Sequence, residues 1–380
     1  MPEMRVLFSF VGGFGHYEPL RPIARAAVAR GHDVTVVCHP GMASTVSADG
    51  FAIAPVGDAV TEPASIIPIA TPDREHELDV VRHGFAGRTA HRRGLALRNV
   101  IAHVRPEAVV CDEADFGATL ATEEAGLPLA VVLVLAAGTF ATPELVAEPL
   151  AAVRVRLGMR AAPLTPHGFA VAPFPPSFRD PSRPLAESAI AIRPAALDRS
   201  TDDARFEDLA DRPLVYATLG TIFNLESGDL FARLLAGLGA LDVAALVTVG
   251  RAIDPATLGP LPSNVRVERF VPQSVVLPHA SVVVSHGGSG SVIGALSHGV
   301  PTVLLPMGAD QPDNAARCVA LGVGIELDPV AATADEIAAA VRTMLDDRGA
   351  RGRAALLAAE AAALPPPSIV IDRLERHIGA

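Results

Sequence analysis

The stretch Ser281-Val-Val-Val-Ser-His-Gly-Gly-Ser-Gly-Ser-Val-Ile-Gly-Ala-Leu-Ser-His-Gly-Val-Pro-Thr-Val-Leu-Leu-Pro306 decides the fold class of this chain. A β-branched apolar run of strand length is followed by a Gly/Ser loop, by a short helix that Gly299 ends, and by a second apolar run after Pro301. This order predicts a strand–helix–strand unit of an α/β protein. The Gly/Ser loop then lies at the carboxyl end of the first strand.

The start of the predicted helix, at about Ser289 to Ser291, is suited to binding phosphate. Unpaired backbone N–H groups and the positive end of the helix dipole meet two hydroxyls there, and Gly287, Gly288 and Gly290 let a ligand approach the backbone. His286 adds a side-chain donor whose charge is adjustable near neutral pH. The alternative reading is a tight connection without a ligand.

A polar pair follows the end of the next predicted strand. Asp310 and Gln311 lie within Met307-Gly-Ala-Asp-Gln-Pro-Asp-Asn314. Consecutive strand ends of an open parallel sheet face the same crevice, so these side chains can reach the far end of a ligand whose phosphates lie at the helix start. The fixed distance between the two motifs favours a ligand site over a tight connection.

HGGSGS, the following GVP and GADQPDNA together resemble the donor-binding region of the GT-B glycosyltransferases of family 1, specifically the bacterial enzymes that decorate natural products. The resemblance implies two Rossmann-like domains whose parallel sheets face each other across a cleft. It also implies that Asp310 and Gln311 hydrogen-bond the sugar of a nucleotide sugar. The residues implied to hold its diphosphate are His286, Gly287, Gly288, Ser289, Gly290 and Ser291.

Composition sets the broad class. A length of 380 residues, half of them apolar, is enough for two domains with their own cores. The net charge of −11 argues against a general role on nucleic acid or on anionic membranes. Cysteines stand singly at Cys38, Cys111 and Cys318, so we expect neither a zinc site nor a disulfide framework, and a cytoplasmic location. The hydrophobic runs have strand length, so neither a signal peptide nor a membrane span is expected.

A second candidate loop follows the predicted strand Arg5 to Phe10 and precedes a helix from about Pro19 to Arg30. Its glycines do not fit the GxGxxG spacing, and Cys38 stands where an acid is expected, so an NAD site is rejected. His16 lies in this loop, at a strand's carboxyl end, where a residue of a ligand crevice is expected. A loop histidine that fills space or caps the helix is the alternative.

The surrounding pattern GGxGHxxPLxPIA also resembles the amino-terminal signature of the same glycosyltransferases. The resemblance implies that His16 is the general base that deprotonates the acceptor hydroxyl, and we assign Gly13 of this loop to the donor site. The reaction needs such a base because an alcohol of high pKa attacks an anomeric carbon poorly, whereas an imidazole can take the proton as the bond forms.

A base of this kind gains from an orienting carboxylate. The predicted strand Glu107 to Asp112 ends in an acid at the same sheet edge, and Asp112 matches the family position that hydrogen-bonds the catalytic histidine. Glu113 and Asp115 lie close by, and their alternative role is to favour the start of the next helix. Asp112 is preferred over Asp115.

The second half repeats the order of strand, glycine and hydroxyl in Pro213-Leu-Val-Tyr-Ala-Thr-Leu-Gly-Thr221. In relatives, the Thr of this loop contacts the terminal phosphate or the sugar, which implies that role for Thr221. The family reads the nucleobase with the segment that here runs from Val265 to Gln273. The residues assigned to it are Phe270, Val271 and Gln273, with Phe270 as the stacking ring or, alternatively, as a core residue.

One departure from the family bears on the donor. Relatives that use UDP-sugars frequently place Glu eight residues after the motif histidine, where it binds the ribose hydroxyls, but this chain has Gly294 there. A carboxylate that pairs with two hydroxyls is of no use on a deoxyribose, so a dTDP-sugar is favoured over a UDP-sugar. No DxD motif occurs, so we expect no metal ligands and no cofactor besides the donor itself.

The domains are expected at 1–200 for the acceptor and at 201–365 for the nucleotide sugar, with a linker at Arg193 to Asp211. A last helix within 366–380 is expected to cross back to the first domain. Residues from Asp73 to Arg105 read as one or two helices with solvated histidines. Aromatic rings in the Pro-rich segment from Pro163 to Pro184 fit either an acceptor pocket or packing against the sheet.

These features predict an inverting transferase that moves a (deoxy)hexose to a small natural-product aglycone such as a polyketide antibiotic. The partners expected are the nucleotide sugar and the aglycone, with no nucleic acid, no membrane and a possible homodimer. The alternatives are another GT-B activity, such as a lipid-linked transferase or a sugar-nucleotide epimerase, and a nucleotide-sugar-binding activator without turnover. A pure binder would need the second-half motif but neither His16 nor Asp112.

Overall fold

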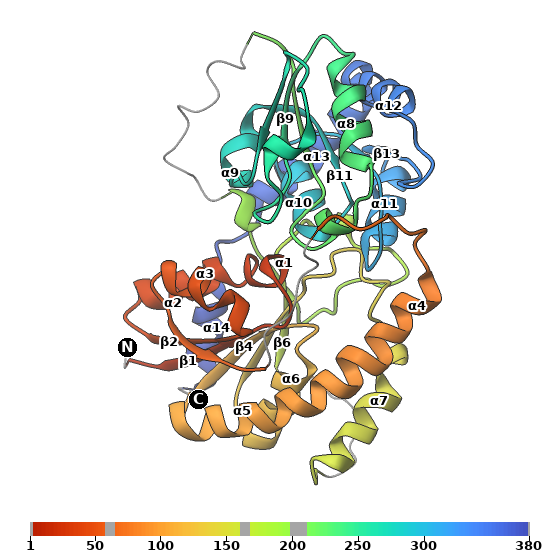
Figure 1. Cartoon of the computed structure of the whole chain (residues 1–380). Helices are drawn as coiled ribbons and strands as arrows, with labels where there is room; N and C mark the ends of the chain where they lie inside the picture. Colours follow the sequence, from red (N-terminus) through yellow and green to blue (C-terminus); the bar gives the residue numbers. More distant parts are fainter. Residues whose placement is uncertain (1–2, 58–64, 160–167, 198–210, 379–380) are drawn as a thin grey trace.

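The computed structural model describes residues 3–57, 65–159, 168–197 and 211–378. It contains two sheets of parallel strands, one from each half of the chain (Figure 1). The first sheet has the order β3-β2-β1-β4-β5-β6-β7 and the second β10-β9-β8-β11-β12-β13. The predicted fold class, α/β with two parallel sheets, is therefore confirmed.

The strands of the first sheet are β1 Arg5–Ser9, β2 Asp33–Cys38, β3 Ala52–Pro55, β4 Ala108–Asp112, β5 Leu129–Val132, β6 Phe169–Ala172 and β7 Ile190–Ala191. Those of the second sheet are β8 Leu214–Thr218, β9 Ala244–Thr248, β10 Val265–Glu268, β11 Ala280–Ser285, β12 Thr302–Leu304 and β13 Gly324–Glu326. The central strands are buried along their whole length, which explains their continuous apolar runs.

The strand order reverses once in each sheet, and both reversals bear on function. In the first sheet, β1 lies between β2 and β4, and in the second, β8 lies between β9 and β11. Ligands of open parallel sheets bind beyond the carboxyl ends of the strands at such a reversal. The loops after β1 and β4, and those after β8 and β11, are therefore the expected places for a site.

Helices cover both faces of each sheet, and the longer ones pack by an apolar face. In the first half they are α1 Phe14–Tyr17, α2 Arg21–Ala29, α3 Ala43–Ala48, α4 Arg74–Asp79, α5 Ala90–Val104, α6 Phe116–Ala125 and α7 Pro143–Arg156. In the second half they are α8 Leu230–Gly239, α9 Gln273–Val276, α10 Ser289–Ser297, α11 Gln311–Ala320, α12 Ala334–Asp346, α13 Arg348–Ala363 and α14 Ser368–Ile378.

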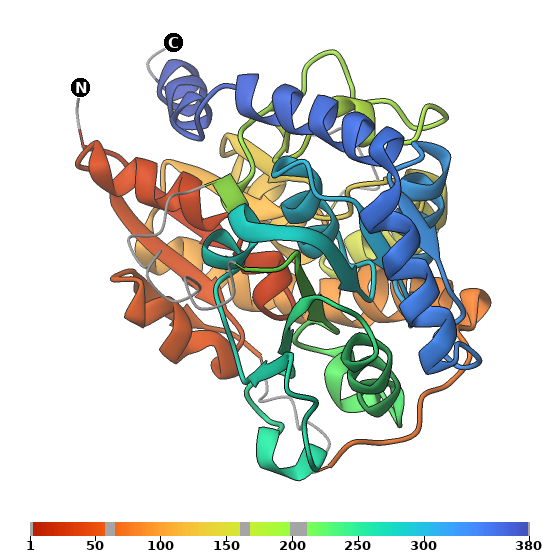
Figure 2. The same ribbon diagram turned by 90° about the horizontal axis from the view of Figure 1, so that it is seen from above.

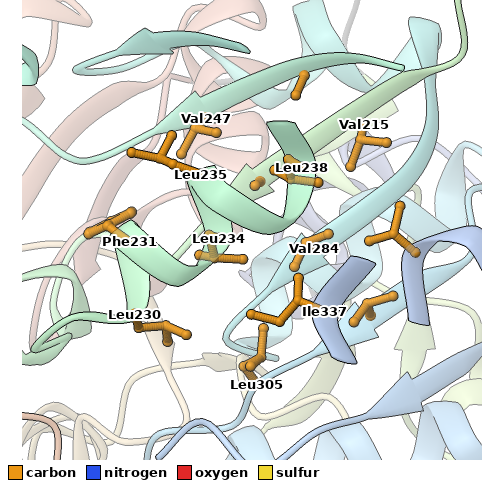
Figure 3. Packing of buried hydrophobic residues seen from close by; sticks show 14 of the residues in the cluster. Val215, Leu230, Phe231, Leu234, Leu235, Leu238, Val247, Val284, Leu305 and Ile337 are labelled. Carbon is orange, nitrogen blue, oxygen red and sulfur yellow. The ribbon is translucent and has the colours of Figure 1, made fainter. Parts of the chain in front are cut away.

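Three of the apolar clusters among the described residues show how the molecule is held together. One lies inside the second half, where α8 and α12 pack on the sheet through side chains such as Leu234, Leu238 and Ile337 (Figure 3). Another lies around the first sheet. A third joins the halves, because it combines Phe174 and Phe178 with residues of α10, α11 and α13. The two halves thus share a buried apolar contact.

The last helix, α14, returns to the first half of the chain. Val370, Ile371 and Leu374 are fully buried in the core around the first sheet. Beside them, His32 pairs with Glu375 at 3.0 Å between Nε2 and Oε1. Figures 1 and 2 show this blue helix beside the red α2, near the amino terminus. The contact makes the carboxyl end of the chain part of the first half's core.

A second crossing runs in the opposite direction. The segment before α4 extends along the second half, where Ile66 and Ile69 pack against its core. The backbone N–H of Ile67 donates to Leu225 at 2.7 Å, and that of Gly228 donates to the Ile67 carbonyl at 3.0 Å. This segment gives the halves a further connection (Figure 1).

One stretch of the described residues, Arg348–Ile378, is long and apolar enough to cross a membrane by length and composition alone. It consists of α13 and α14, which Pro365, Pro366 and Pro367 separate. Consecutive prolines interrupt helical hydrogen bonding, so the stretch is not one continuous span. The absence of membrane contact and the cytoplasmic location stay predictions.

Several sequence expectations can be compared directly with these elements. The run from Asp73 to Arg105 forms helices, but a π-helix, Val80–Thr89, separates α4 from α5, which the sequence did not indicate. Of the two readings for the Pro-rich segment, its described residues support packing, because Phe169, Phe174 and Phe178 are buried. The boundary expected at residue 200 lies outside the described residues, and the division into domains stays a prediction.

Candidate active site

The loop after β1 and the end of β4 bring His16 and Asp112 together. His16 lies in the short helix α1, and its Nδ1 is 3.3 Å from Oδ1 of Asp112. Gly12, at φ +75°, passes close over the imidazole, where a Cβ would lie 3.1 Å from its Cδ2. The histidine side chain is 21% exposed while the carboxylate is fully buried, so one edge of the ring faces the acid and part of it stays accessible.

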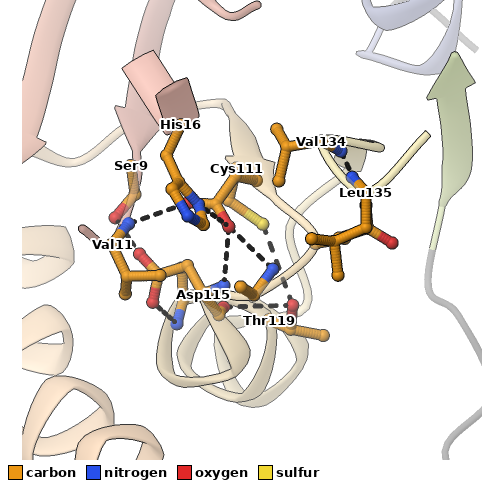
Figure 4. A network of polar contacts seen from close by, with 12 residues as sticks. Ser9, Val11, His16, Cys111, Asp115, Thr119, Val134 and Leu135 are labelled. Atoms are coloured by element: carbon orange, nitrogen blue, oxygen red, sulfur yellow. Dashed lines mark hydrogen bonds and ion pairs between the residues drawn. The ribbon is translucent and has the colours of Figure 1, made fainter. Parts of the chain in front are cut away.

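Asp112 is fixed by the backbone. Its Oδ2 accepts from the N–H of Val11 at 2.7 Å, and its Oδ1 accepts from those of Ala114 and Asp115 at 2.7 and 3.1 Å. Three donors from two loops hold this buried carboxylate in one orientation and offset its desolvation. Asp112 is thus preorganised as a neighbour for His16. Figure 4 labels His16 together with Val11 and Asp115, two of the residues whose backbone N–H groups hold this carboxylate.

Asp115 has different partners. It accepts from Arg93 Nε at 2.9 Å and from the Ser9 hydroxyl at 2.6 Å, and it caps α6 through the N–H of Ala118. Its two oxygens are occupied by Arg93, Ser9 and Ala118, whereas the carboxylate beside His16 is that of Asp112. The catalytic role of Asp112 stays a prediction.

Opposing effects set the pKa of His16. Burial lowers it, but the negative charges of Asp112, Asp310 and Glu113 outweigh burial, so the pKa lies above its ordinary value. Asp310 comes from the second half of the chain, and Phe14 of α1 lies edge-on to Phe270 of that half at 6.2 Å between ring centroids, so both halves meet near α1.

Glu113 supports the same edge of the first sheet. Its Oε1 accepts from the N–H groups of Val134 and Leu135, each at 2.6 Å. Burial raises the pKa of this carboxyl to about 7, although these two N–H groups and the charge of Arg179 act in the opposite direction. Glu113 thus orders the segment after β5.

In the second half, the start of α10 is open to an anion. Gly288 is the N-cap residue, and no side chain hydrogen-bonds to the first amides of the helix. Gly287 before it has φ +87°, which only glycine adopts without strain. The first turn therefore presents free backbone N–H groups together with the positive end of the helix dipole.

His286 lies beneath this turn. A Cβ at Gly220 would lie 2.7 Å from its Nε2, and one at Gly288 would lie 2.6 Å away, so both glycines are needed for its position. The ring is buried and its Nδ1 has no hydrogen-bond partner among the described residues. Burial lowers its pKa to about 4. Burial thus favours the neutral form of the ring, whereas the sequence pattern predicts a charge that is adjustable near neutral pH.

The two serines of the turn already have partners. Ser289 donates to Asp310 Oδ2 at 2.7 Å and accepts from the N–H of Ala136 at 2.9 Å. Ser291 accepts from Nε2 of Gln273 at 3.2 Å. These contacts leave the backbone N–H groups as the principal free donors of the turn.

Asp310 and Gln311 follow β12, as predicted, and both are buried. Burial raises the pKa of the Asp310 carboxyl. The side-chain oxygen of Gln311 accepts from the N–H groups of Met307 and Gly308, at 2.7 and 3.3 Å, and so holds its own loop. Only the amide nitrogen of the Gln311 side chain is then available for a contact with the sugar.

The remaining predicted donor residues differ in their accessibility. Phe270 is 37% exposed, with the Arg251 guanidinium carbon 4.9 Å from its ring centroid and Phe14 edge-on at 6.2 Å, so it is not a core residue. Val271 is buried in the core, which leaves only its backbone for a ligand. Thr221 is exposed and Gly13 is partly exposed.

Gly294 faces neighbouring side chains and not open space. A Cβ there would lie 2.8 Å from Oε1 of Gln273 and 3.0 Å from Cδ1 of Leu277. The side chain of Gln273 thus occupies the space into which a side chain at position 294 would extend.

Two residues of interest were not assigned from the sequence. Asn314 hydrogen-bonds Asp310, and their spacing of four residues, which places two side chains on one face of a helix, is a signal that could have identified it. Ala309, with φ +53°, holds a left-handed backbone directly before Asp310, and no sequence signal identifies it. Among the described residues, no group of three His, Cys, Asp or Glu side chains is arranged to hold a metal ion.

Comparisons with known proteins agree with this architecture. Residues 232–377 match the family described as erythromycin biosynthesis protein CIII-like, C-terminal domain. The chain is 27% identical to 4'-demethylrebeccamycin synthase from Lentzea aerocolonigenes, over 98% of this chain and 99% of that protein.

Two solved structures have the same fold over nearly their whole length. The glycosyltransferase SnogD from Streptomyces nogalater gives a TM-score of 0.80 at 25% identity, covering 99% of this chain and 100% of that one. Spinosyn rhamnosyltransferase SpnG complexed with thymidine diphosphate gives a TM-score of 0.82 at 22% identity. This match covers 98% of this chain and 100% of that one.

The fold and its relatives define the chain as a glycosyltransferase with the GT-B fold. More particularly, it is related to the glycosyltransferases of antibiotic and other natural-product pathways.

Proposed function

We propose that this protein is an inverting glycosyltransferase that moves a hexose or deoxyhexose from a nucleoside-diphosphate sugar to a small natural-product aglycone, such as a polyketide antibiotic. The observation that carries the proposal is the 3.3 Å contact between His16 Nδ1 and the buried Asp112, in a loop that meets the second half, where a Cβ at Gly13 would lie 3.8 Å from Cδ1 of Ile222. A base and a donor-binding loop from different halves thus share one site.

His16 is the general base in this proposal. The negative charge of Asp112 favours the tautomer with its proton on Nδ1, which leaves the lone pair of Nε2 for the acceptor hydroxyl. As the acceptor oxygen forms its bond to the anomeric carbon, the hydroxyl proton passes to Nε2 and the bond from that carbon to the diphosphate breaks. Attack from the face opposite the diphosphate inverts the anomeric configuration.

The leaving diphosphate is held by the start of α10. The uncapped N–H groups, the helix dipole and the neutral His286 supply donors without a metal ion. Asp310 and the amide nitrogen of Gln311 contact the sugar hydroxyls, while Thr221 lies at the phosphate or sugar and Phe270 at the base. Metal independence is part of the proposal and is tested with it.

Thymidine diphosphate is favoured as the nucleotide. SpnG, which shares the fold, is known complexed with thymidine diphosphate. Position 294 offers no carboxylate for ribose hydroxyls, and Gln273 occupies the neighbouring space. A deoxyribose has one hydroxyl fewer to satisfy, which matches a site without that acid.

The first experiment is a thermal melt of the purified protein with TDP, UDP and GDP, each with and without Mg²⁺. A nucleotide that binds the folded state and is present at a concentration of about 100 times its Kd adds roughly 2.7 kcal/mol to the free energy of unfolding. We expect the largest shift with TDP and no dependence on Mg²⁺. No shift with any nucleotide would refute the donor site, and a larger shift with UDP would refute only the choice of TDP.

A further inference from the structure

Asn314 of α11 is fully buried and has no role in the proposal above. Its Nδ2 donates to the Gly287 carbonyl at 2.9 Å, to the Ser289 hydroxyl at 3.1 Å and to Asp310 Oδ2 at 2.8 Å. One amide group therefore joins the loop before α10 to the carboxylate before α11. Three acceptors around Nδ2 also fix which way the amide is oriented.

The same side chain reaches the first half of the molecule. Its Oδ1 accepts from the N–H of Ala137 at 3.3 Å, while the neighbouring N–H of Ala136 donates to the Ser289 hydroxyl at 2.9 Å. Both backbone groups belong to the segment that follows β5 of the first sheet. Asn314 and Ser289 thus form a polar junction between the halves, beside their shared apolar cluster.

The first-half side of this junction is held in place. Arg179 donates to the carbonyl of Leu135 at 3.0 Å, and Glu113 accepts the N–H groups of Val134 and Leu135. Glu113 directly follows Asp112, the acid beside His16. A continuous series of contacts therefore runs from the edge of the first sheet to Asp310.

A neutral amide suits this place for a physical reason. Asp310 is only 9% exposed, so its charged form depends on nearby donors, and Ser289 and Asn314 both donate to its Oδ2. Both contacts are made to the same oxygen, Oδ2. A cation at position 314 would neutralise the carboxylate, and an apolar side chain would leave it with one donor fewer.

We propose that Asn314 is a positioning residue, which orients Asp310 toward the donor sugar and is itself held by the segment at Ala136 and Ala137. The inference rests on the proposed contact between Asp310 and the sugar. Asn314 itself does not touch the substrate.

The test separates the sugar from the nucleotide. Calorimetric titration with TDP and with TDP-glucose is compared for the wild type and Asn314→Ala. For Asn314→Ala we expect the Kd for TDP to stay within about threefold of the wild-type value, because TDP does not reach Asp310. The Kd for TDP-glucose should rise about tenfold. Equal changes for both ligands, or none for TDP-glucose, would overturn the inference, since a merely structural residue does not distinguish them.

Cys318→Ala is the matched control. Cys318 lies one turn further along α11, is also fully buried, and packs in the apolar cluster between the halves. It is expected to lower the melting temperature without altering the ratio of the two Kd values. If it alters that ratio as Asn314→Ala does, the effect belongs to packing of α11 and the inference is wrong.

An exchange of the two side chains covers the case in which Asn314→Ala does not fold. The double variant Asp310→Asn with Asn314→Asp restores a hydrogen bond between the positions but moves the charge. The carboxylate at position 314 cannot donate to the Gly287 carbonyl, so we expect a melting temperature below that of the wild type, with TDP-glucose binding still weakened about tenfold. Recovery of TDP-glucose binding would contradict the role given to Asn314. If wild-type protein binds neither ligand, the proposed function itself fails.

Discussion

At the scale of single residues, the chemistry depends on how charge is arranged around His16. Burial lowers its pKa, and three carboxylates raise it further than burial lowers it. A base must be unprotonated to act, so activity should rise with pH through this elevated pKa. The same shift means that protonated His16 stabilises the fold at low pH, and that this contribution is lost as pH rises through the elevated value.

The substitution Asp112→Asn tests this arrangement. Without the charge, the acid limb of the profile of kcat/KM against pH should move to lower pH, because His16 then loses its proton more easily. The plateau should fall about 100-fold or more, because the imidazole loses its orienting acid. The measurement is the rate of nucleotide release from nucleotide sugar and acceptor between pH 5 and 9.

Asp242→Asn is the control for that measurement, since Asp242 is an exposed carboxylate whose side chain is 92% accessible. This substitution should change neither the pH of the acid limb nor the plateau value of kcat/KM. An Asp112→Asn profile with an unmoved acid limb would show that His16 is not the group that titrates.

At the scale of elements, α10 combines a ligand-binding end with a packed body. Its first turn is uncapped and glycine-rich, whereas its later residues pack on α9 and on the short turn Ala195–Leu197. Gly294 lies in this packed part, and its lack of a side chain makes room for Gln273 and Leu277. The absence of an acid there is therefore tied to helix packing as well as to the donor.

The pair Gly294→Glu and Gly290→Ala tests this interpretation. A side chain at position 294 must displace Gln273, so Gly294→Glu should lower the free energy of unfolding by about 1–3 kcal/mol without producing a preference for UDP over TDP. Gly290→Ala, in the same helix, should not destabilise, because a Cβ there meets nothing within 4 Å. Denaturant unfolding and the nucleotide melt measure both effects, and a stable Gly294→Glu variant that prefers UDP would contradict the packing argument.

At the scale of the whole molecule, the chain crosses between its halves more than once. The segment before α4 extends to the second half, and α14 returns to the first. We propose domains at 1–200 and 201–365 with the terminal segment 366–380 belonging structurally to the first. The first domain is then made from two separate parts of the chain, whereas the second is one uninterrupted part.

Leu374→Ala tests the place of α14 in the first core. Leu374 is fully buried, so its truncation should cost about 2–5 kcal/mol of the free energy of unfolding. Leu356→Ala in α13 is the control, because Leu356 is 72% exposed and should change stability by less than about 0.5 kcal/mol. Equal melting temperatures for the two variants would show that α14 is not part of the core.

Much of this architecture could be predicted because local patterns carry it. Continuous apolar runs marked the buried parallel strands, glycines marked the turns at strand ends, and HGGSGS lay where a strand meets a helix. Parallel strands place their carboxyl ends on one edge, so His16, Asp112 and His286 could be assigned to sheet edges from sequence order alone. Resemblance to a family then supplied the chemical roles.

Other features exist only in the folded chain. The sequence alone does not reveal that Asp115 is bound to Arg93, that burial keeps His286 neutral, or that Ser289 and Asn314 meet the backbone of Ala136 and Ala137. Each depends on contacts between residues far apart in the chain and on the loss of water around them. The sequence determined which groups reach the site, and tertiary packing decided which of them remain free to bind, because burial and pairing depend on three-dimensional neighbours.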